Sequence, residues 1–481
     1  SPVAARMSIT PAFLAIDQGS HASRAAVYDS RGQRGEIVYR AVATECPRPG
    51  WVEQDPEELL ESVQECVTQA TRGIGSTALR AGLATQRSSI VCWDRESGAA
   101  LSPVLSWRDR RAADWLENFR GRQDDIGERT GLPLSAHYGA SKIAWCLANL
   151  DRVRGAHDRL VIGPLASFLA HRLCPGTVPV SDPANASRTL LFNRHTLDWD
   201  DHLLGLFGID RAILPLCVPT RHSYGVMQAA AQTIPLELVT GDQAAALFAG
   251  AETGSGNAFV NLGTGAFLQI ATGAEALRVE GLLTSIAYAD EDGPRYVLEG
   301  TVNGAGNALT QMAGELGFDA EDYAVQLDAW IDSVREPPLF LNGIGGLGSP
   351  WWQAEFDSRF IGAGAARARM VAVAESILFL LQANLDRARV ALAPTRIRVG
   401  GGIARSDGLC QRLADLSQLP VWRQGETEST LAGVACLLGS KPAPSARDHC
   451  FEPAGNRAVQ ERYRRWLIEL EQALEANSGP R

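Results

Sequence analysis

The sequence lacks several patterns that define common classes of protein. Its nine cysteines form no Cys-x-x-Cys pair and their number is odd, which argues against a disulfide framework or a zinc site. No apolar run reaches transmembrane length, and the N-terminus has no charged-then-apolar leader. Neither a Walker A loop nor a Rossmann fingerprint is present. We therefore expect a cytoplasmic protein with reduced, buried thiols and no membrane contact.

The composition also lacks an excess of basic residues. The net charge is -10 over 481 residues, which argues against a nucleic-acid partner or an anionic membrane surface. Hydrophobic residues make up 45% and charged residues 21%, the proportions of a globular protein. A chain of this length exceeds one ordinary core, so the sequence predicts two domains.

The most informative stretch present is Val239 to Phe248. An apolar strand ends at Gly241, Asp242 and Gln243 follow, and a run of small apolar residues continues as a helix. A carboxylate at such a turn accepts backbone N–H groups and suits abstraction of a proton from an alcohol. The alternative, which the stretch alone leaves open, is an ordinary helix cap.

Two further strands run into glycine turns and then resume as strands. Phe13 to Ile16 lead into Asp17-Gln18-Gly19-Ser20, and Ala258 to Leu262 lead into Gly263-Thr264-Gly265. Hydroxyls and backbone N–H groups at these tips can bind phosphoryl oxygens, with Arg24 as a counter-charge and Asp17 as a Mg²⁺ contact. A polar hairpin without a ligand is the alternative for either one.

Other candidate positions also follow predicted strands. The glycine turn Gly400-Gly401-Gly402 allows backbone to approach a ligand such as adenosine. Arg87, Trp107 and Asp109 each follow an apolar strand, where open α/β sheets place their ligands. Trp107 offers an apolar wall, and the two charged residues could bind hydroxyls.

Taken together, these motifs resemble the FGGY carbohydrate kinase family, and most closely its glycerol kinase branch. The resemblance runs from about Phe13 to about Gly439 and rests on the stretches Asp17-Gln18-Gly19, Thr85-Gln86-Arg87, Asn185 to Thr189, Gly241-Asp242-Gln243 and Gly263-Thr264-Gly265. It implies an α/β fold with two actin/hexokinase-like (ribonuclease-H-like) domains and a central interdomain cleft. We expect the first domain over residues 1–247 and the second over residues 248–481.

The resemblance also implies roles for individual residues. Asp242 matches the catalytic base of an ATP-dependent kinase that phosphorylates a primary hydroxyl of a polyol or sugar, and Asp17 matches the Mg²⁺ contact. Small-molecule substrate contacts are expected from Arg87, Trp107, Asp109, His137 and Gln243. ATP contacts are expected from Asp17, Ser20, Arg24, Gly263, Thr264, Gly401, Gly402 and Ser406. Family members are often dimers or tetramers, so a homodimer or a homotetramer is the expected assembly.

Some positions depart from the glycerol kinase pattern and bear on the substrate. Ser88 stands where glycerol kinases have Glu, and His137 stands where they have a substrate-facing Tyr. A buried hydroxyl left without its partner costs about 1–3 kcal/mol, so glycerol affinity should fall roughly 10- to 100-fold. The Gly400 turn looks more like that of pentulose kinases. A xylulose, ribulose or tetritol kinase, and a non-catalytic ATP-binding sensor, are therefore the alternatives.

Overall fold

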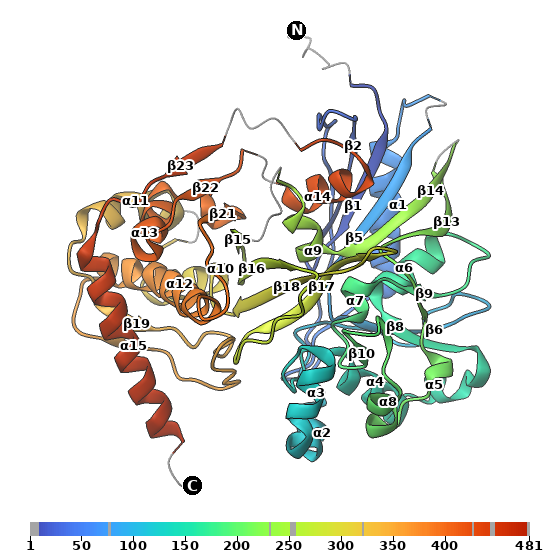
Figure 1. Cartoon of the computed structure of the whole chain (residues 1–481), viewed down its shortest axis with the longest axis horizontal. Helices are drawn as coiled ribbons and strands as arrows, with labels where there is room; N and C mark the ends of the chain where they lie inside the picture. The colour runs from blue at the N-terminus through green and yellow to red at the C-terminus, as the bar shows by residue number, and fades with distance from the viewer. Residues whose placement is uncertain are drawn as a thin grey trace.

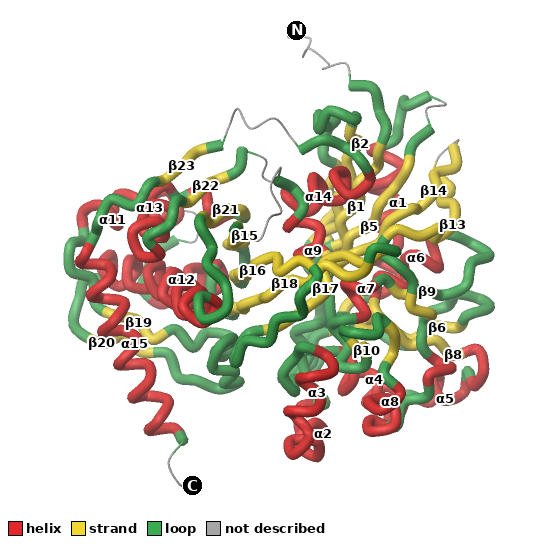
Figure 2. Tube along the Cα trace, in the orientation of Figure 1, coloured by secondary structure: helices red, strands yellow, loops and turns green. Residues whose placement is uncertain are grey.

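The computed structural model describes residues 9–75, 78–229, 232–250, 256–319, 322–425, 428–442 and 448–478. The chain forms two lobes, one built mainly from its first half and one from its second half (Figure 1). Each lobe holds a mixed β-sheet with helices packed against it (Figure 2). This arrangement confirms the predicted α/β class with two lobes.

The first lobe is built on a six-stranded sheet in the order β13-β14-β5-β1-β2-β3. β1 pairs antiparallel with β2 and parallel with β5, and β14 pairs parallel with β5. The predicted hairpin at Asp17 is therefore confirmed. The strands are β1 (Phe13–Gln18), β2 (Ala22–Tyr28), β3 (Val38–Ala41), β5 (Arg80–Thr85), β13 (Arg221–Ala229) and β14 (Gln232–Gly241).

Alternate residues of β1 serve two different cores, as the period of a strand requires. Leu14 and Ile16 pack with helices α1 (Pro56–Ala70) and α6 (Leu165–Leu173) on one face. Phe13 and Ala15 pack on the other face with α14 (Ser429–Leu438). The sheet is therefore covered on both faces, and one of its covers comes from the C-terminal part of the chain.

The lower part of the first lobe is a separate layer of short elements around a second apolar core. A four-stranded sheet joins β4 (Glu53–Gln54), β7 (Val104–Leu105), β6 (Ile90–Asp94) and β8 (Leu160–Pro164). Shorter pairs are β9 (Val180–Ser181) with β12 (Leu216–Cys217) and β10 (Phe192–Asn193) with β11 (Asp198–Trp199). The helices are α2 (Ala113–Leu116), α3 (Gln123–Thr130), α4 (Gly139–Asn149), α5 (Asp151–Gly155), α7 (Pro183–Ala186) and α8 (Asp201–Phe207). Helix α9 (Asp242–Leu247) follows β14 and lies beside α14 instead.

The second lobe is built on a seven-stranded sheet in the order β17-β18-β16-β15-β21-β22-β23. β15 and β16 form the second predicted hairpin, and β15 pairs parallel with β21. The strands are β15 (Asn257–Leu262), β16 (Ala266–Gly273), β17 (Leu283–Asp290), β18 (Gly293–Val302), β21 (Arg396–Gly400), β22 (Val421–Arg423) and β23 (His449–Phe451). Also present are β19 (Leu339–Leu341), β20 (Arg359–Ile361), α10 (Gly306–Glu315), α11 (Asp322–Ser333), α12 (Ala366–Ala388), α13 (Asp407–Ser417) and α15 (Arg457–Asn477).

Helix α12 is the central helix of the second lobe. By length and hydropathy alone it could cross a membrane, but most of it is buried inside the lobe. Glu375 on this helix is buried and pairs with Arg412 and Arg462 at 2.6 Å each. A buried carboxylate paired inside the protein is typical of a core helix, so α12 is a core element.

Strands β17 and β18 join the lobes. Leu283, Ile286 and Tyr296 on these strands belong to the apolar core of the first lobe's lower layer. In Figure 1 the two strands run through the middle of the molecule, between the lobes. Polar residues carried on these strands can therefore face residues of the first lobe.

Candidate active site

The strand register of the first sheet brings together residues that lie far apart in the sequence. Gln18, Thr85 and Gly241 occupy matching positions on the parallel strands β1, β5 and β14. Because all three strands end at the same edge, Asp17, Arg87 and Asp242 meet there. Gly241 is needed for this packing, since a Cβ at its position would lie 2.5 Å from the Arg87 Cδ.

Asp17 is a buried carboxylate with unused binding capacity. Its Oδ1 atom is buried and makes no hydrogen bond within the described chain, while its Oδ2 lies 3.9 Å from Arg24 Nη1. Burial, followed by the charge of Asp242, raises the pKa of Asp17 to about 8. Such an oxygen suits Mg²⁺, which proteins often hold through one or two carboxylates together with substrate phosphates.

Asp242 is the first residue of α9 but does not cap it. Its Oδ1 accepts a hydrogen bond from the N–H of the next residue, Gln243, at 2.7 Å, and the helix has no side-chain cap. Burial raises the pKa of Asp242, whereas the charge of Arg87 acts in the opposite direction. The Gln243 Oε1 beside it is buried without a partner among the described residues. The side chains of Asp242 and Gln243 thus offer hydrogen-bond acceptors for a ligand.

A buried ionic cluster adjoins Asp242 and joins the two lobes. Glu299 on β18 accepts hydrogen bonds from Arg87 and Arg188, both at 2.8 Å, and all three side chains are at most 5% exposed. Ser285 and Gln269 donate to the same carboxylate at 2.8 and 3.0 Å. Roles for Arg188 and Glu299 were not predicted from the sequence. A Glu in the apolar stretch Tyr296 to Val302 was the available signal.

Trp107 and His137 form one wall next to this cluster. Their ring centroids lie 5.4 Å apart, and the His137 ring also lies 5.1 Å from that of Tyr138. The Trp107 indole donates a hydrogen bond to the Ser20 hydroxyl at 2.8 Å. The wall of Trp107 and His137 is therefore in direct contact with the hairpin of β1 and β2.

Asp109 is held by bonds within the protein. Its carboxylate is buried, accepts from Arg111 Nε and Nη2 at 3.0 and 2.7 Å, and also accepts from the Val52 N–H at 2.7 Å. These bonds engage the oxygens expected to meet a substrate hydroxyl. Asp109 therefore holds the loop after β7 in place, and its substrate contact stays a prediction.

The second sheet places its glycine turns in the same way as the first. Asn261 and Gly400 are matched on the parallel strands β15 and β21, so the Gly263-Thr264-Gly265 loop and the Gly401 turn share one edge. Gly401 has a φ of 92°, and a Cβ there would lie 2.4 Å from the Leu262 carbonyl oxygen. Ser406 accepts from the Leu409 N–H at 3.1 Å and caps α13, a role the sequence did not predict.

Helix α14 crosses α9 so closely that only glycine fits at the crossing. A Cβ on Gly433 would lie 1.8 Å from the Ala245 carbonyl oxygen.

We expect Gly433→Ala to separate the helices, lower the free energy of unfolding by about 1–3 kcal/mol, and lower kcat by displacing Asp242. Thermal unfolding and steady-state rates measure both effects. Gly314→Ala in α10, which meets nothing within 4 Å, is the control and should leave both unchanged or raise stability.

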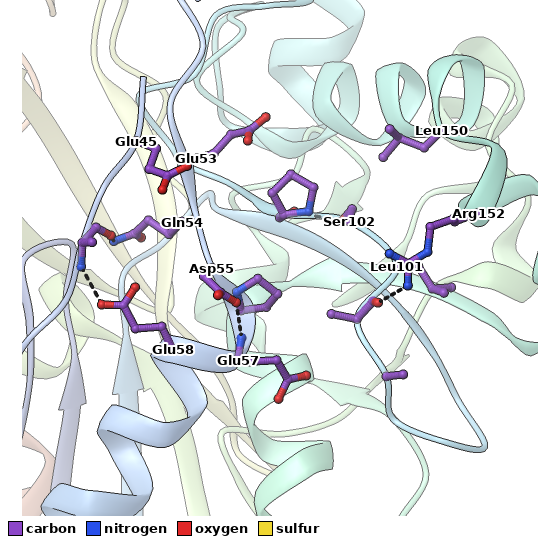
Figure 3. Close-up of a pocket in the computed structure, with 15 residues that line it drawn as sticks. Glu45, Glu53, Gln54, Asp55, Glu57, Glu58, Leu101, Ser102, Leu150 and Arg152 are labelled. Atoms are coloured by element: carbon purple, nitrogen blue, oxygen red, sulfur yellow. Dashed lines mark hydrogen bonds between the residues drawn. The ribbon is translucent and has the colours of Figure 1, made fainter. Parts of the chain in front are cut away.

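A cavity of about 610 Å³ lies in the first lobe, apart from the carboxylates described above. Figure 3 shows that Glu45, Glu53, Asp55, Glu57 and Glu58 are among its lining side chains. Gln54 also lines it and donates to the Ser20 carbonyl at 2.9 Å. The cavity contains none of the predicted site residues, and we assign it no ligand.

Comparison with known proteins shows which family models and relatives the chain matches. The N-terminal domain of the FGGY family of carbohydrate kinases matches residues 12–249, and the C-terminal domain of that family matches residues 258–440. Glycerol kinase of Geobacter sp. (strain M21) is 34% identical over 479 residues, covering 94% of this chain and 96% of that protein. Glycerol kinase of Stenotrophomonas maltophilia (strain R551-3) is 36% identical, covering 90% of each.

Solved structures share the fold over nearly the whole chain. Plasmodium falciparum glycerol kinase with ADP has a TM-score of 0.85 at 23% identity and covers 96% of this chain and 98% of its own. Ligand-bound xylulose kinase from Lactobacillus acidophilus has a TM-score of 0.82 at 20% identity, covering 97% and 99%. At these identities the likeness concerns the fold, and it confirms the predicted two-domain kinase architecture.

Proposed function

This chain belongs to the FGGY family of carbohydrate kinases and is an ATP-dependent sugar or polyol kinase, and from this premise we propose that Asp242 is its general base. In this proposal a primary hydroxyl of a short polyol or sugar accepts the phosphoryl group. The main support for this proposal is the arrangement of Asp242. Its carboxylate is buried at the edge of the sheet beside Asp17, and it does not cap its own helix.

The proposed step moves one phosphoryl group and one proton. The substrate hydroxyl oxygen attacks the γ-phosphorus, the new O–P bond forms as the bond to the β,γ-bridging oxygen breaks, and ADP leaves with that electron pair. Asp242 takes the hydroxyl proton, which contributes about 10²–10⁴-fold to the rate. Its raised pKa, a result of burial, brings its basicity closer to neutral pH.

Each side of the site then has a distinct task. Mg²⁺, held through Asp17 and the ATP phosphates, would neutralise charge that develops on the phosphoryl oxygens. Ser20, Gly263 and Thr264, in the loops of the two hairpins, and Arg24 on β2, beside Asp17, would bind the phosphates. Gly401 and Gly402 would let the backbone approach adenosine closely, and Ser406, which caps α13, would hold this turn in place.

The substrate side is formed by Arg87, Trp107, His137 and Gln243. Gln243 supports this role because its Oε1 is buried, has no partner among the described residues, and can accept from a hydroxyl. The relatives named above are glycerol kinases, yet Ser88 here offers no carboxylate to a substrate hydroxyl. We therefore propose a polyol or sugar other than glycerol as the preferred substrate. The enzyme would act in the cytoplasm, and as a homodimer or homotetramer.

A substrate panel tests this proposal. With ATP and Mg²⁺, coupled ADP detection should show turnover that depends on an added sugar or polyol. Glycerol should be used with a kcat/KM roughly 10- to 100-fold below that of the preferred substrate, as expected for one unpaired buried polar group. Xylulose, ribulose and erythritol complete the panel. Efficient turnover of glycerol would contradict our interpretation of Ser88, and ATP binding without any turnover would support a non-catalytic sensor.

A further inference from the structure

Positive charges outnumber carboxylates around His137, on the substrate side of the site. The charges of Arg188, Arg110, Lys142 and Arg87 all act on this ring and, together with burial, lower the pKa of His137 well below its usual range. They come from four different segments of the first lobe. The neighbouring carboxylates are Glu299, the proposed base Asp242, and Asp109, whose charge acts on Arg110 and Lys142. Lys142 is committed to structure, because its ammonium donates to the backbone carbonyls of residues 136 and 137.

Arg110 is a partly buried cation without a carboxylate partner in the described chain. Its Nη1 donates to the Trp107 carbonyl oxygen at 3.2 Å, and no ion pair of this guanidinium is formed. Burial lowers the pKa of Arg110, as expected for a charge removed from water. The charge of the nearby Asp109 acts in the opposite direction, but that carboxylate is bound by Arg111. A desolvated charge without a partner is costly, so an anion at this place would stabilise it.

Arg188 shares its carboxylate partner with another arginine and also donates to the Ser285 hydroxyl at 3.3 Å. Arg188 and Arg87 both bind the carboxylate of Glu299. The Arg188 Nε lies 3.5 Å from the Ser88 hydroxyl, and its guanidinium lies 5.1 Å from the centre of the Tyr138 ring. Ser88 is buried and has a φ of 70°, so its short side chain is fixed beside this arginine. A carboxylate at position 88 would neutralise the surplus charge, but the residue here is neutral.

We infer that the substrate itself supplies the missing carboxylate. On this inference, which rests on the proposed function, the substrate is a short polyhydroxy acid. Its carboxylate lies near Ser88, between Arg188 and Arg110, and its primary hydroxyl lies at Asp242. The Trp107 and His137 rings, 5.4 Å apart, line the carbon chain between these two ends. Charge complementarity of this kind selects among substrates of similar length.

Matched pairs of substrates test the inference directly. Each pair consists of a polyol and the acid of the same chain length: glycerol with glycerate, erythritol with erythronate, and xylitol with xylonate. With the wild-type enzyme, the best acid should exceed its polyol in kcat/KM by about 10- to 100-fold, the range for one hydrogen bond to a charged group. Equal or higher activity on the polyol in every pair would overturn the inference.

Substitutions at position 88 distinguish charge from volume. Ser88→Glu places a carboxylate beside Arg188 and should reverse the preference, lowering kcat/KM for the acid and raising it for the polyol. Ser88→Gln has nearly the same size without the charge and should keep the acid preferred. If both variants change the acid-to-polyol ratio alike, volume rather than charge decides, and the inference fails.

Arg110→Gln provides an independent readout. It should raise the KM for the acid by about 10-fold or more, while the KM for ATP stays close to the wild-type value. Arg120→Gln, at an exposed arginine paired with Glu117, is the control for a general change in charge. A rise in the KM for ATP instead would assign Arg110 to the nucleotide and overturn the inference. If wild type phosphorylates neither acids nor neutral sugars and polyols, the proposed function itself fails.

Discussion

Asp242→Asn should lower kcat by about 10²–10⁴-fold while leaving the protein folded and able to bind ATP. The amide keeps the size of the side chain and its acceptor for the Gln243 N–H, but it cannot take a proton. The loss should therefore appear in kcat, whereas the affinity for ATP, measured by titration calorimetry, should change little. Rates from coupled ADP detection give the first quantity.

Asp55→Asn is the matched control for this experiment. Asp55 also stands at the start of a helix, where its carboxylate accepts from the Glu57 N–H at 2.9 Å and caps α1. Asn caps a helix about as well as Asp, so this variant should keep both activity and stability. Near-normal turnover of Asp242→Asn would remove Asp242 from the role of base, whatever the control shows.

Glu299→Gln should lower the free energy of unfolding by about 3–5 kcal/mol, the usual cost of removing one partner from a buried ion pair. The substitution leaves Arg87 and Arg188 buried without the carboxylate that both of them bind at 2.8 Å. Denaturant unfolding monitored by circular dichroism measures the change. Glu65→Gln is the control, because Glu65 is exposed and its pair with Arg40 is expected to contribute about 0–1 kcal/mol. Equal stability of both variants would contradict the importance of the cluster.

The difference in stability between the wild type and Glu299→Gln should depend on pH. Arg87 and Arg188 outweigh burial and lower the pKa of Glu299 from 4.5 to about 2. Because the folded-state pKa lies below the unfolded one, this stabilisation is complete above pH 4.5 and is lost as the pH falls toward 2. The gap in stability between wild type and Glu299→Gln should therefore narrow in acid. A constant gap from pH 7 to pH 3 would contradict this account.

Local patterns in the sequence were enough to predict the two hairpins and the Gly241 turn. In each case the strand, the glycine and the polar residue lie within about ten residues, so backbone geometry alone determines their arrangement. Whether Asp242 acts as a base, and where the boundary near residue 247 falls, stay predictions. The structure adds that Asp242 does not cap its helix.

Long-range contacts could not be predicted from such patterns. Glu299 meets partners that are 212 and 111 residues away in the sequence, and nothing near it indicates which arginines it will bind. Asp109 stood in a suitable position after a strand, but Arg111 binds its carboxylate. Helix α14 lies between β22 and β23 of the second sheet in the sequence and yet packs on the first sheet. Tertiary packing decides all three.

The hydrogen bond from the Trp107 indole to the Ser20 hydroxyl has a consequence for how the two reactants associate. With Trp107 on the substrate side and Ser20 on the nucleotide side, as proposed, a ligand that shifts the indole would also free or reorient the hydroxyl and so alter the affinity for the nucleotide. Linkage makes the effect reciprocal, and each reactant changes the dissociation constant of the other by one common factor. We therefore expect the two reactants to bind in a coupled rather than an independent way.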